Sequence, residues 1–223
     1  MDIAEQMQEV ALFAGISDGA RKALSEQARR RTYRPGEMIL GETDSVRAFY
    51  VVLSGQVKLY KSSPEGKEQT VSLLGKGEPF GLCTAFAVEP FPVNVMALED
   101  SAILTIPGPV IEAVAGKEPS LLLNVISILS RRFKESMTMI ESLSLKEIPE
   151  RLATFLVHAL KNKKGDRLEL TITQRELAKI LGSTPEALSR AIRKMNDRGI
   201  VAAEGRTITV LDRKTLEILA EGD

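Results

Sequence analysis

The sequence predicts an α+β chain made of an N-terminal β-roll, a long helix and a C-terminal winged helix-turn-helix domain. Short apolar runs punctuated by Gly and Pro extend from about Thr32 to Pro107, which is typical of a β-sandwich or barrel. A heptad pattern follows, and then two helices joined by a glycine turn precede two short strands. The predicted parts are residues 1–118, 119–145 and 146–223.

Composition limits the classes of protein to which the chain can belong. It has 223 residues, 43% of them hydrophobic, which is enough for one large domain or for two modest domains with their own cores. The formal net charge is zero, but residues 146–223 carry +3 and the rest −3, a weak basic bias in the C-terminal part. The single Cys83 excludes an intramolecular disulfide, a four-thiolate iron–sulfur cluster and a structural zinc site.

No segment of the sequence resembles a leader or a membrane span. The N-terminus lacks a basic stretch followed by an apolar core, and no apolar run approaches the roughly 18 residues that span a bilayer. A cytoplasmic protein without membrane contact is therefore expected.

Helices are expected in roughly the first 30 residues, because apolar residues recur there at helical spacing. These residues are Met7, Val10, Ala11, Ala14, Leu24 and Ala28. The expected strands that follow are "EMIL", "AFYVVL", "QVKLYK", "QTVSLL", "VNVMAL" and "AILTI".

The long helix predicted at about Ser120 to Leu145 has apolar residues on two faces. One face follows the alternating spacing of a heptad seam over three repeats, which predicts a homodimer interface. The seam consists of Leu122, Ile126, Leu129, Phe133, Ser136, Ile140 and Leu143. The second face, with Leu121, Val125, Ile128 and Met139, is expected to pack on the β domain. The alternative is a single buried helix inside a monomer.

The C-terminal part contains the residues expected to start and stop a helix-turn-helix. Thr173 and Thr184 are suited to cap the two helices, and Pro185 fits the first position of the second helix. Gly182 can adopt the left-handed conformation of the turn between them. A new helix is expected to begin near Pro149, after a break at Leu145 to Pro149.

The second helix of this pair has one apolar and one polar face. Leu188, Ile192 and Met195 recur at helical spacing and should face the core. The outward residues are then Glu186, Ser189, Arg190 and Arg193. Arg can form two hydrogen bonds to guanine, and Glu can accept one from a cytosine amino group, which favours a DNA recognition helix. Glu186 is four residues before Arg190, so it is also expected to hold Arg190 in place. The alternative is an ordinary surface ion pair between Glu186 and Arg190.

Nearly the whole chain resembles the CRP/FNR family of bacterial transcription regulators. The resemblance rests on "YRPGEMIL", on "FYVVLSGQVKLYKSSPEGKEQTVSLLGKGEPFG" and on the helix-turn-helix. It implies that the β-roll is a jelly roll like a cyclic-nucleotide-binding domain. It also implies a homodimer that binds two-fold symmetric operators on double-stranded DNA and recruits or blocks RNA polymerase. Glu186, Ser189 and Arg190 match the E-x-x-S-R pattern of the FNR branch, which implies a TTGA-like half-site. Candidate backbone contacts are Thr173, Gln174, Thr184 and Arg193.

The resemblance does not extend to the cAMP site of the family. Members similar to the cAMP receptor protein hold the nucleotide with F-G-E-x-x-L followed by R-S/T-A. Leu82 stands in place of the ribose-binding Glu, and Pro92 and Val93 in place of the phosphate-binding pair. Ser136 and Met137 stand where such proteins offer two hydroxyls to the adenine. A buried phosphate needs a cation and donors, so no cAMP binding is expected.

The effector pocket that remains is apolar, and its ligand stays open. An apolar small molecule fits it, as does a haem sensing NO or CO, while a domain that binds no effector is a further alternative. The candidate residues are Phe80, Leu82, Cys83, Phe86, Phe91, Val93, Val95, Phe133, Ser136 and Met137. Cys83 or a Met would have to be the axial haem ligand, because His158 lies in the other domain, where a structural role is expected. The alternative for Cys83 is a small buried hydrophobe.

The leading interpretation is an effector-responsive, homodimeric DNA-binding transcription regulator, in which the effector biases a hinge near Leu145 to Pro149. The alternative is a cyclic-nucleotide-binding module whose helix-turn-helix mediates protein contact. No enzyme is expected, because the lone His has no matched nucleophile and no metal or phosphate-loop spacing occurs. One departure from the family is "LGETDS", where relatives usually have a glycine near Thr43.

Overall fold

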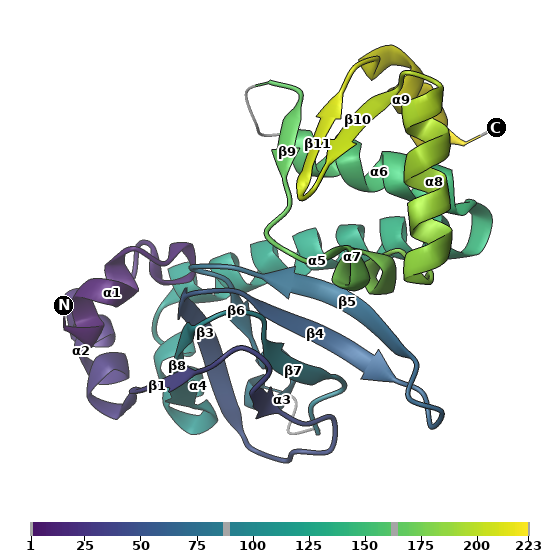
Figure 1. Cartoon of the computed structure of the whole chain (residues 1–223). Coiled ribbons are helices and arrows are strands. Elements are labelled where there is room, and N and C mark those ends of the chain that lie inside the picture. Colours follow the sequence, from purple (N-terminus) through teal and green to yellow (C-terminus); the bar gives the residue numbers. More distant parts are fainter. Residues whose placement is uncertain (1, 87–89, 162–164, 223) are drawn as a thin grey trace. The chain divides into compact units, whose positions relative to one another are not determined.

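The computed structural model describes residues 2–86, 90–161 and 165–222. The chain divides into two compact units, Met1–Arg132 and Phe133–Asp223, so the long helix α5 (Pro119–Leu145) contributes to both (Figure 1). The three-part division at residues 118 and 145 stays a prediction.

The first unit contains two sheets and the helices that cover one of them. Helices α1 (Ile3–Gln8) and α2 (Asp18–Gln27) flank a 3₁₀ turn at Ala11–Phe13, as expected of the N-terminal segment. One antiparallel sheet has the order β1-β8-β3-β6 and the other β2-β7-β4-β5. Their strands are β1 (Arg29–Tyr33), β2 (Met38–Leu40), β3 (Ala48–Ser54), β4 (Val57–Ser62), β5 (Glu68–Leu74), β6 (Pro79–Phe80), β7 (Asn94–Ala97) and β8 (Ser101–Pro107).

The central strands of the first sheet are buried on both faces, which explains why they form continuous apolar runs instead of alternating. Phe49 and Val51 of β3 pack with the helices, whereas Tyr50 and Val52 pack with the second sheet. The six predicted runs all form strands. A jelly-roll-like β domain is therefore confirmed.

Several short elements of this unit were not expected from the sequence. Strand β1 begins with Arg29, Arg30 and Arg31, and all three are exposed, so it has no apolar pattern. It forms because its backbone pairs with β8 at the edge of the sheet. Helices α3 (Leu82–Phe86) and α4 (Gly108–Ala115) were also missed, since their apolar residues serve the same core as the strands.

The start of α5 packs on this unit, as the second apolar face predicts. Leu121 and Val125 are buried in the helix-side core, and Ile128 is partly buried against it. The Asn124 side chain donates hydrogen bonds to the carbonyls of Leu12 and Ala14, both at 2.9 Å. The N-terminal half of α5 is thus fixed to the first unit.

The second unit contains a helix-turn-helix and a small sheet, which confirms the predicted winged fold (Figure 1). Helix α6 (Ile148–Leu160) packs against α8 (Pro185–Asp197) and α9 (Arg213–Glu221), and α7 (Gln174–Ile180) precedes the turn. The sheet has the order β10-β11-β9, with β9 (Arg167–Glu169), β10 (Val201–Glu204) and β11 (Thr207–Val210). Helix α9 was not expected.

Candidate nucleic-acid interface

The start of α8 is built as the sequence predicts. The Thr184 hydroxyl accepts a hydrogen bond of 3.2 Å from the backbone N–H of Ala187, and Pro185 takes the first helical position. Gly182 has φ +60°, the left-handed conformation that the turn requires. The Thr173 hydroxyl caps α7 in the same way, accepting from the N–H of Glu176 at 3.2 Å. The two helices therefore begin and end at defined residues.

The two faces of α8 are separated as expected. Leu188, Ile192 and Met195 are all buried. The opposite side is exposed and polar, with the predicted base-contacting residues Glu186, Ser189 and Arg190 in its first half and Arg193 just beyond them. The predicted backbone-contact residues Thr173, Gln174 and Thr184 are exposed at the starts of α7 and α8. An N-terminal half that is polar and exposed is what a major-groove recognition helix presents to base edges.

Glu186 does not hold Arg190, contrary to expectation. Within the described part of the chain, no ion pair within 4.0 Å joins these two side chains. The pKa of Glu186 lies below its ordinary value because its carboxylate accepts hydrogen bonds, first from its own backbone N–H and then from the Thr184 hydroxyl. The charge of Arg190 contributes least. Glu186 therefore belongs to the cap of α8, and Arg190 stays available for a ligand.

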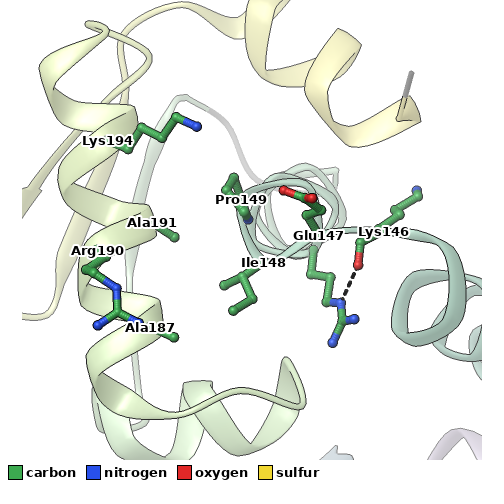
Figure 2. Close-up of a pocket in the computed structure, with 9 residues that line it drawn as sticks. Lys146, Glu147, Ile148, Pro149, Ala187, Arg190, Ala191 and Lys194 are labelled. Atoms are coloured by element: carbon green, nitrogen blue, oxygen red, sulfur yellow. Dashed lines mark hydrogen bonds between the residues drawn. The ribbon is translucent and has the colours of Figure 1, made fainter.

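An open groove of about 430 Å³ runs beside the recognition helix. Figure 2 shows Ala187, Arg190, Ala191 and Lys194 along α8 on one side of it. Ile148, Pro149, Lys146 and Glu147, from the junction of α5 and α6, lie on the other side. The sequence predicted a break at Leu145 to Pro149, but it did not single out Lys146 and Arg151 as residues beside the recognition helix, because they belong to no periodic pattern there.

The predicted effector residues lie in two different parts of the molecule. Phe80, Leu82, Phe91 and Val95 are buried in the first unit, whereas Cys83, Phe86 and Val93 are partly buried there. Phe133, Ser136 and Met137 are exposed on α5 within the second unit.

The inner face of the β-roll is filled by aromatic side chains, including one that the sequence did not single out. The Tyr50 ring stacks on Phe80 with centroids 4.9 Å apart, and Phe80 lies 6.4 Å from Phe91. Burial raises the pKa of the Tyr50 phenol to about 12, with Tyr33 and Asp44 adding smaller upward effects. Tyr50 was missed because in its run, "AFYVVL", every residue is buried and no single one stands out.

The predicted dimer seam is an apolar stripe along α5. Leu122, Ile126, Leu129, Phe133 and Ile140 are all exposed, with Phe133 at 67%. Leu143 is half-buried, and Ser136 lies on the same stripe. Such a row of exposed large apolar side chains is unusual on a surface that stays in water, so a partner is expected to cover it.

Other predicted features are located as follows. His158 is exposed in the last turn of α6, and Cys83 is half-buried in α3.

Among the described residues, no group of three or more His, Cys, Asp or Glu side chains is arranged to hold a metal ion. Nor does that part of the chain contain a helix long and apolar enough to cross a membrane. The residues Ala87 to Glu89, between Phe86 and Phe91, lie outside the described ranges.

Comparison with known proteins finds relatives of both units. Residues 30–118 match the cyclic nucleotide-binding domain, and residues 150–219 match the Crp-like helix-turn-helix domain. The chain is 30% identical to the transcriptional activator protein Anr of Pseudomonas protegens, over 90% of this chain and 84% of that protein. It is 29% identical to the cyclic AMP receptor protein of Thermus thermophilus, over 97% of this chain and 99% of that protein.

Solved structures show the same arrangement of elements. FixK2 from Bradyrhizobium japonicum superposes with a TM-score of 0.76 at 25% identity, covering 86% of this chain and 96% of that one. A CooA mutant from Carboxydothermus hydrogenoformans superposes with a TM-score of 0.80 at 24% identity, covering 96% and 99% of the two chains. The second likeness concerns the fold alone.

Proposed function

Because the chain belongs to the CRP/FNR family of bacterial transcription regulators, we propose that it is an effector-responsive homodimer that binds a palindromic TTGA-like operator. The observation that carries the proposal is the exposed trio Glu186, Ser189 and Arg190 on the first half of α8. In this proposal the trio contacts the bases, with Arg190 binding guanine in a fork. Thr173, Gln174, Thr184 and Arg193 contact the DNA backbone and set the register.

A homodimer presents two such helices to one duplex. The exposed stripe of α5 supports this part of the proposal, because pairing two copies would remove its apolar surface from water. Two-fold symmetry of the protein then demands an inverted repeat in the DNA, with half-site centres about one helical turn apart. From such an operator in the cytoplasm, the bound dimer recruits or blocks RNA polymerase.

The proposed effector binds the β-roll and is an apolar small molecule, or haem carrying NO or CO. The apolar side chains Phe80, Leu82, Phe91 and Val95 support this class of ligand, since none of them offers a donor or a charge. If the effector is haem, the thiolate of Cys83, in α3 beside them, or a Met would be the axial ligand. A ligand entering between the sheets has to displace part of the Tyr50–Phe80–Phe91 stack.

The first test is selection of bound duplexes from a random DNA library with the purified protein. The expected result is enrichment of TTGA and its inverted copy TCAA.

The purified Arg190→Ala variant should then lose about 1–3 kcal/mol of binding free energy for the selected duplex, measured by fluorescence anisotropy. Loss of one guanidinium fork should relax specificity at the guanine and leave the dimer intact in sedimentation. Arg213→Ala is the matched control, because Arg213 lies on α9 instead of α8 and forms exposed ion pairs with Asp166 and Glu217.

Unchanged affinity of Arg190→Ala for the selected duplex would refute the assignment of base contact to Arg190. Enrichment of no common sequence at all would refute the proposed operator.

A further inference from the structure

A single side chain ties together three segments at the junction of α5 and α6. Arg151 donates from Nε to the carbonyl of Lys146 at 2.8 Å, the bond that ends on Lys146 in Figure 2. Its Nη2 donates to the carbonyl of Leu143 at 3.0 Å, and its Nη1 to the carbonyl of Leu181 at 3.1 Å. Leu143 is in the last turn of α5, Lys146 in the linker, and Leu181 at the end of α7.

The chemistry of the guanidinium suits this position. The last carbonyls of a helix have no partner within the helix and carry partial negative charge, so a cation beside them is favourable. Arg151 meets two such ends at once, those of α5 and α7. Its donors lie in a rigid planar fork and it stays protonated at every physiological pH, so the bonds fix angles as well as distances.

A second cation, the ammonium group of Lys146, bonds the same linker to the end of α9 and to α6. Lys146 Nζ donates to the carbonyl of Ala220 at 2.6 Å and to the Thr154 hydroxyl at 3.3 Å, and it lies 3.4 Å from a Glu141 carboxylate oxygen. The side chain of Lys146 is only 9% exposed. The linker is therefore bonded both to the helix-turn-helix and to the end of α9.

We infer that Arg151 is a positioning residue for operator recognition, which holds the turn before α8 at a fixed place relative to the end of α5. The turn Leu181 to Ser183 leads directly into the Thr184 cap, so a fixed Leu181 fixes the start of the recognition helix. This inference rests on the proposed function. If α5 pairs in the dimer, Arg151 transmits the geometry of that pair to the separation of the two recognition helices.

The inference changes the role of the segment Leu145 to Pro149. A hinge there would have to break the Arg151 and Lys146 bonds within the unit Phe133–Asp223. In this inference the segment is a rigid connection, so the end of α5 moves as one body with the helix-turn-helix.

The first experiment measures preference for half-site spacing. The probes are duplexes with TTGA and TCAA whose centres are about ten base pairs apart, and variants with the spacer one or two base pairs longer or shorter. The wild-type dimer should prefer one spacing by roughly tenfold or more, and Arg151→Met should reduce the preference to about threefold or less. Arg151→Lys keeps the charge and part of the bonding, so it should fall in between. Arg213→Met, which removes only exposed ion pairs, should keep the wild-type profile.

A second experiment needs no DNA. The backbone N–H of Lys146 donates to Ser142 at 3.2 Å, and that of Ser183 donates to Ala178 at 2.9 Å. In hydrogen exchange of the full-length protein, Arg151→Met should accelerate both amides by roughly tenfold, because it releases both segments. Arg213→Met should accelerate neither.

A folded Arg151→Met dimer with the wild-type spacing profile would overturn the inference. So would exchange that rises uniformly over the whole unit, which would indicate mere loss of stability. If the wild-type protein binds none of the duplexes, the proposed operator is wrong. The exchange rates of the Lys146 and Ser183 amides still test whether Arg151 holds the turn. If Arg151→Met does not fold, Arg151→Lys is compared with wild type in both experiments, and equality in both contradicts the inference.

Discussion

At the scale of single residues, local chemistry decides where the recognition helix begins and what it presents. The Thr184 hydroxyl and Pro185 start the helix, and both are recognisable from the sequence because capping needs only neighbouring atoms. The role of Glu186 is different. Its spacing from Arg190 suggested an ion pair, but the carboxylate bonds to its own helix terminus. The spacing of four residues places the Arg190 side chain within reach of Glu186, but only the three-dimensional structure shows which groups Glu186 bonds.

In the first unit, Gly81 likewise has a contact that the sequence does not reveal. Its φ is +79°, and a Cβ there would lie 2.8 Å from the Tyr50 ring and 2.9 Å from the Ala48 carbonyl oxygen. Gly77 has nearly the same φ, +84°, with nothing within 4 Å of a Cβ. The sequence does not distinguish the two glycines, and only the structure shows that Gly81 is also a close contact.

We therefore predict that Gly81→Ala destabilises the protein more than Gly77→Ala. The left-handed conformation alone should cost each variant about 1–2 kcal/mol of unfolding free energy. The close contact should add about 1–3 kcal/mol for Gly81→Ala. Urea unfolding followed by circular dichroism measures both. Equal losses would mean that β3 and Tyr50 move aside freely, contrary to the packing described for them.

At the scale of elements, α5 combines two interfaces in one helix. Leu121 and Val125 are buried in the first unit, while Leu122 and Ile126 are exposed at 42% and 58% on the other side. The heptad spacing distinguished these faces without coordinates, since consecutive residues of a helix project about 100° apart around its axis. Strand β1 is the contrary case, because its exposed arginines carry no pattern and only pairing with β8 makes it a strand.

A charge placed on the stripe should separate the dimer. Ile126→Glu would bury two carboxylates in the proposed seam, and should weaken dimerisation by roughly two kcal/mol or more. Operator affinity should fall with it, since one recognition helix makes half the contacts. Ser127→Glu adds the same charge one residue along, on an exposed position off the seam, and should leave the dimer intact. Sedimentation velocity over a concentration series measures both, and an unaltered Ile126→Glu dimer would place the interface elsewhere.

At the scale of the whole molecule, membership of the family explains the architecture but does not identify the effector, which depends on the side chains of this chain. A cyclic nucleotide-binding domain covers residues 30–118, yet Leu82 is 8% exposed and apolar where the family's cAMP site has a carboxylate. Pro92 and Val93 offer neither cation nor donor for a phosphate.

Titration calorimetry with cAMP and cGMP should therefore give no binding heat at micromolar protein. Dissociation constants in the micromolar range would favour the alternative, a cyclic-nucleotide-binding module. Absorption spectra of the protein with haem, before and after NO, test the haem form of the proposal. A haem band that shifts with NO in wild type and is altered in Cys83→Ala supports ligation by Cys83. The absence of any haem-dependent band would leave an apolar small molecule as the proposed effector.

The sequence by itself determined the order of domains, the two faces of α5 and the caps and faces of α8. These follow from period, turn residues and neighbouring side chains, which act over a few residues along the chain. The tertiary structure alone decided that Tyr50 stacks on Phe80, that β1 joins a sheet, and that Arg151 bonds Leu181. Those contacts join residues far apart in the chain, and a hydrogen bond or a ring contact depends on the folded path that brings its two atoms within reach.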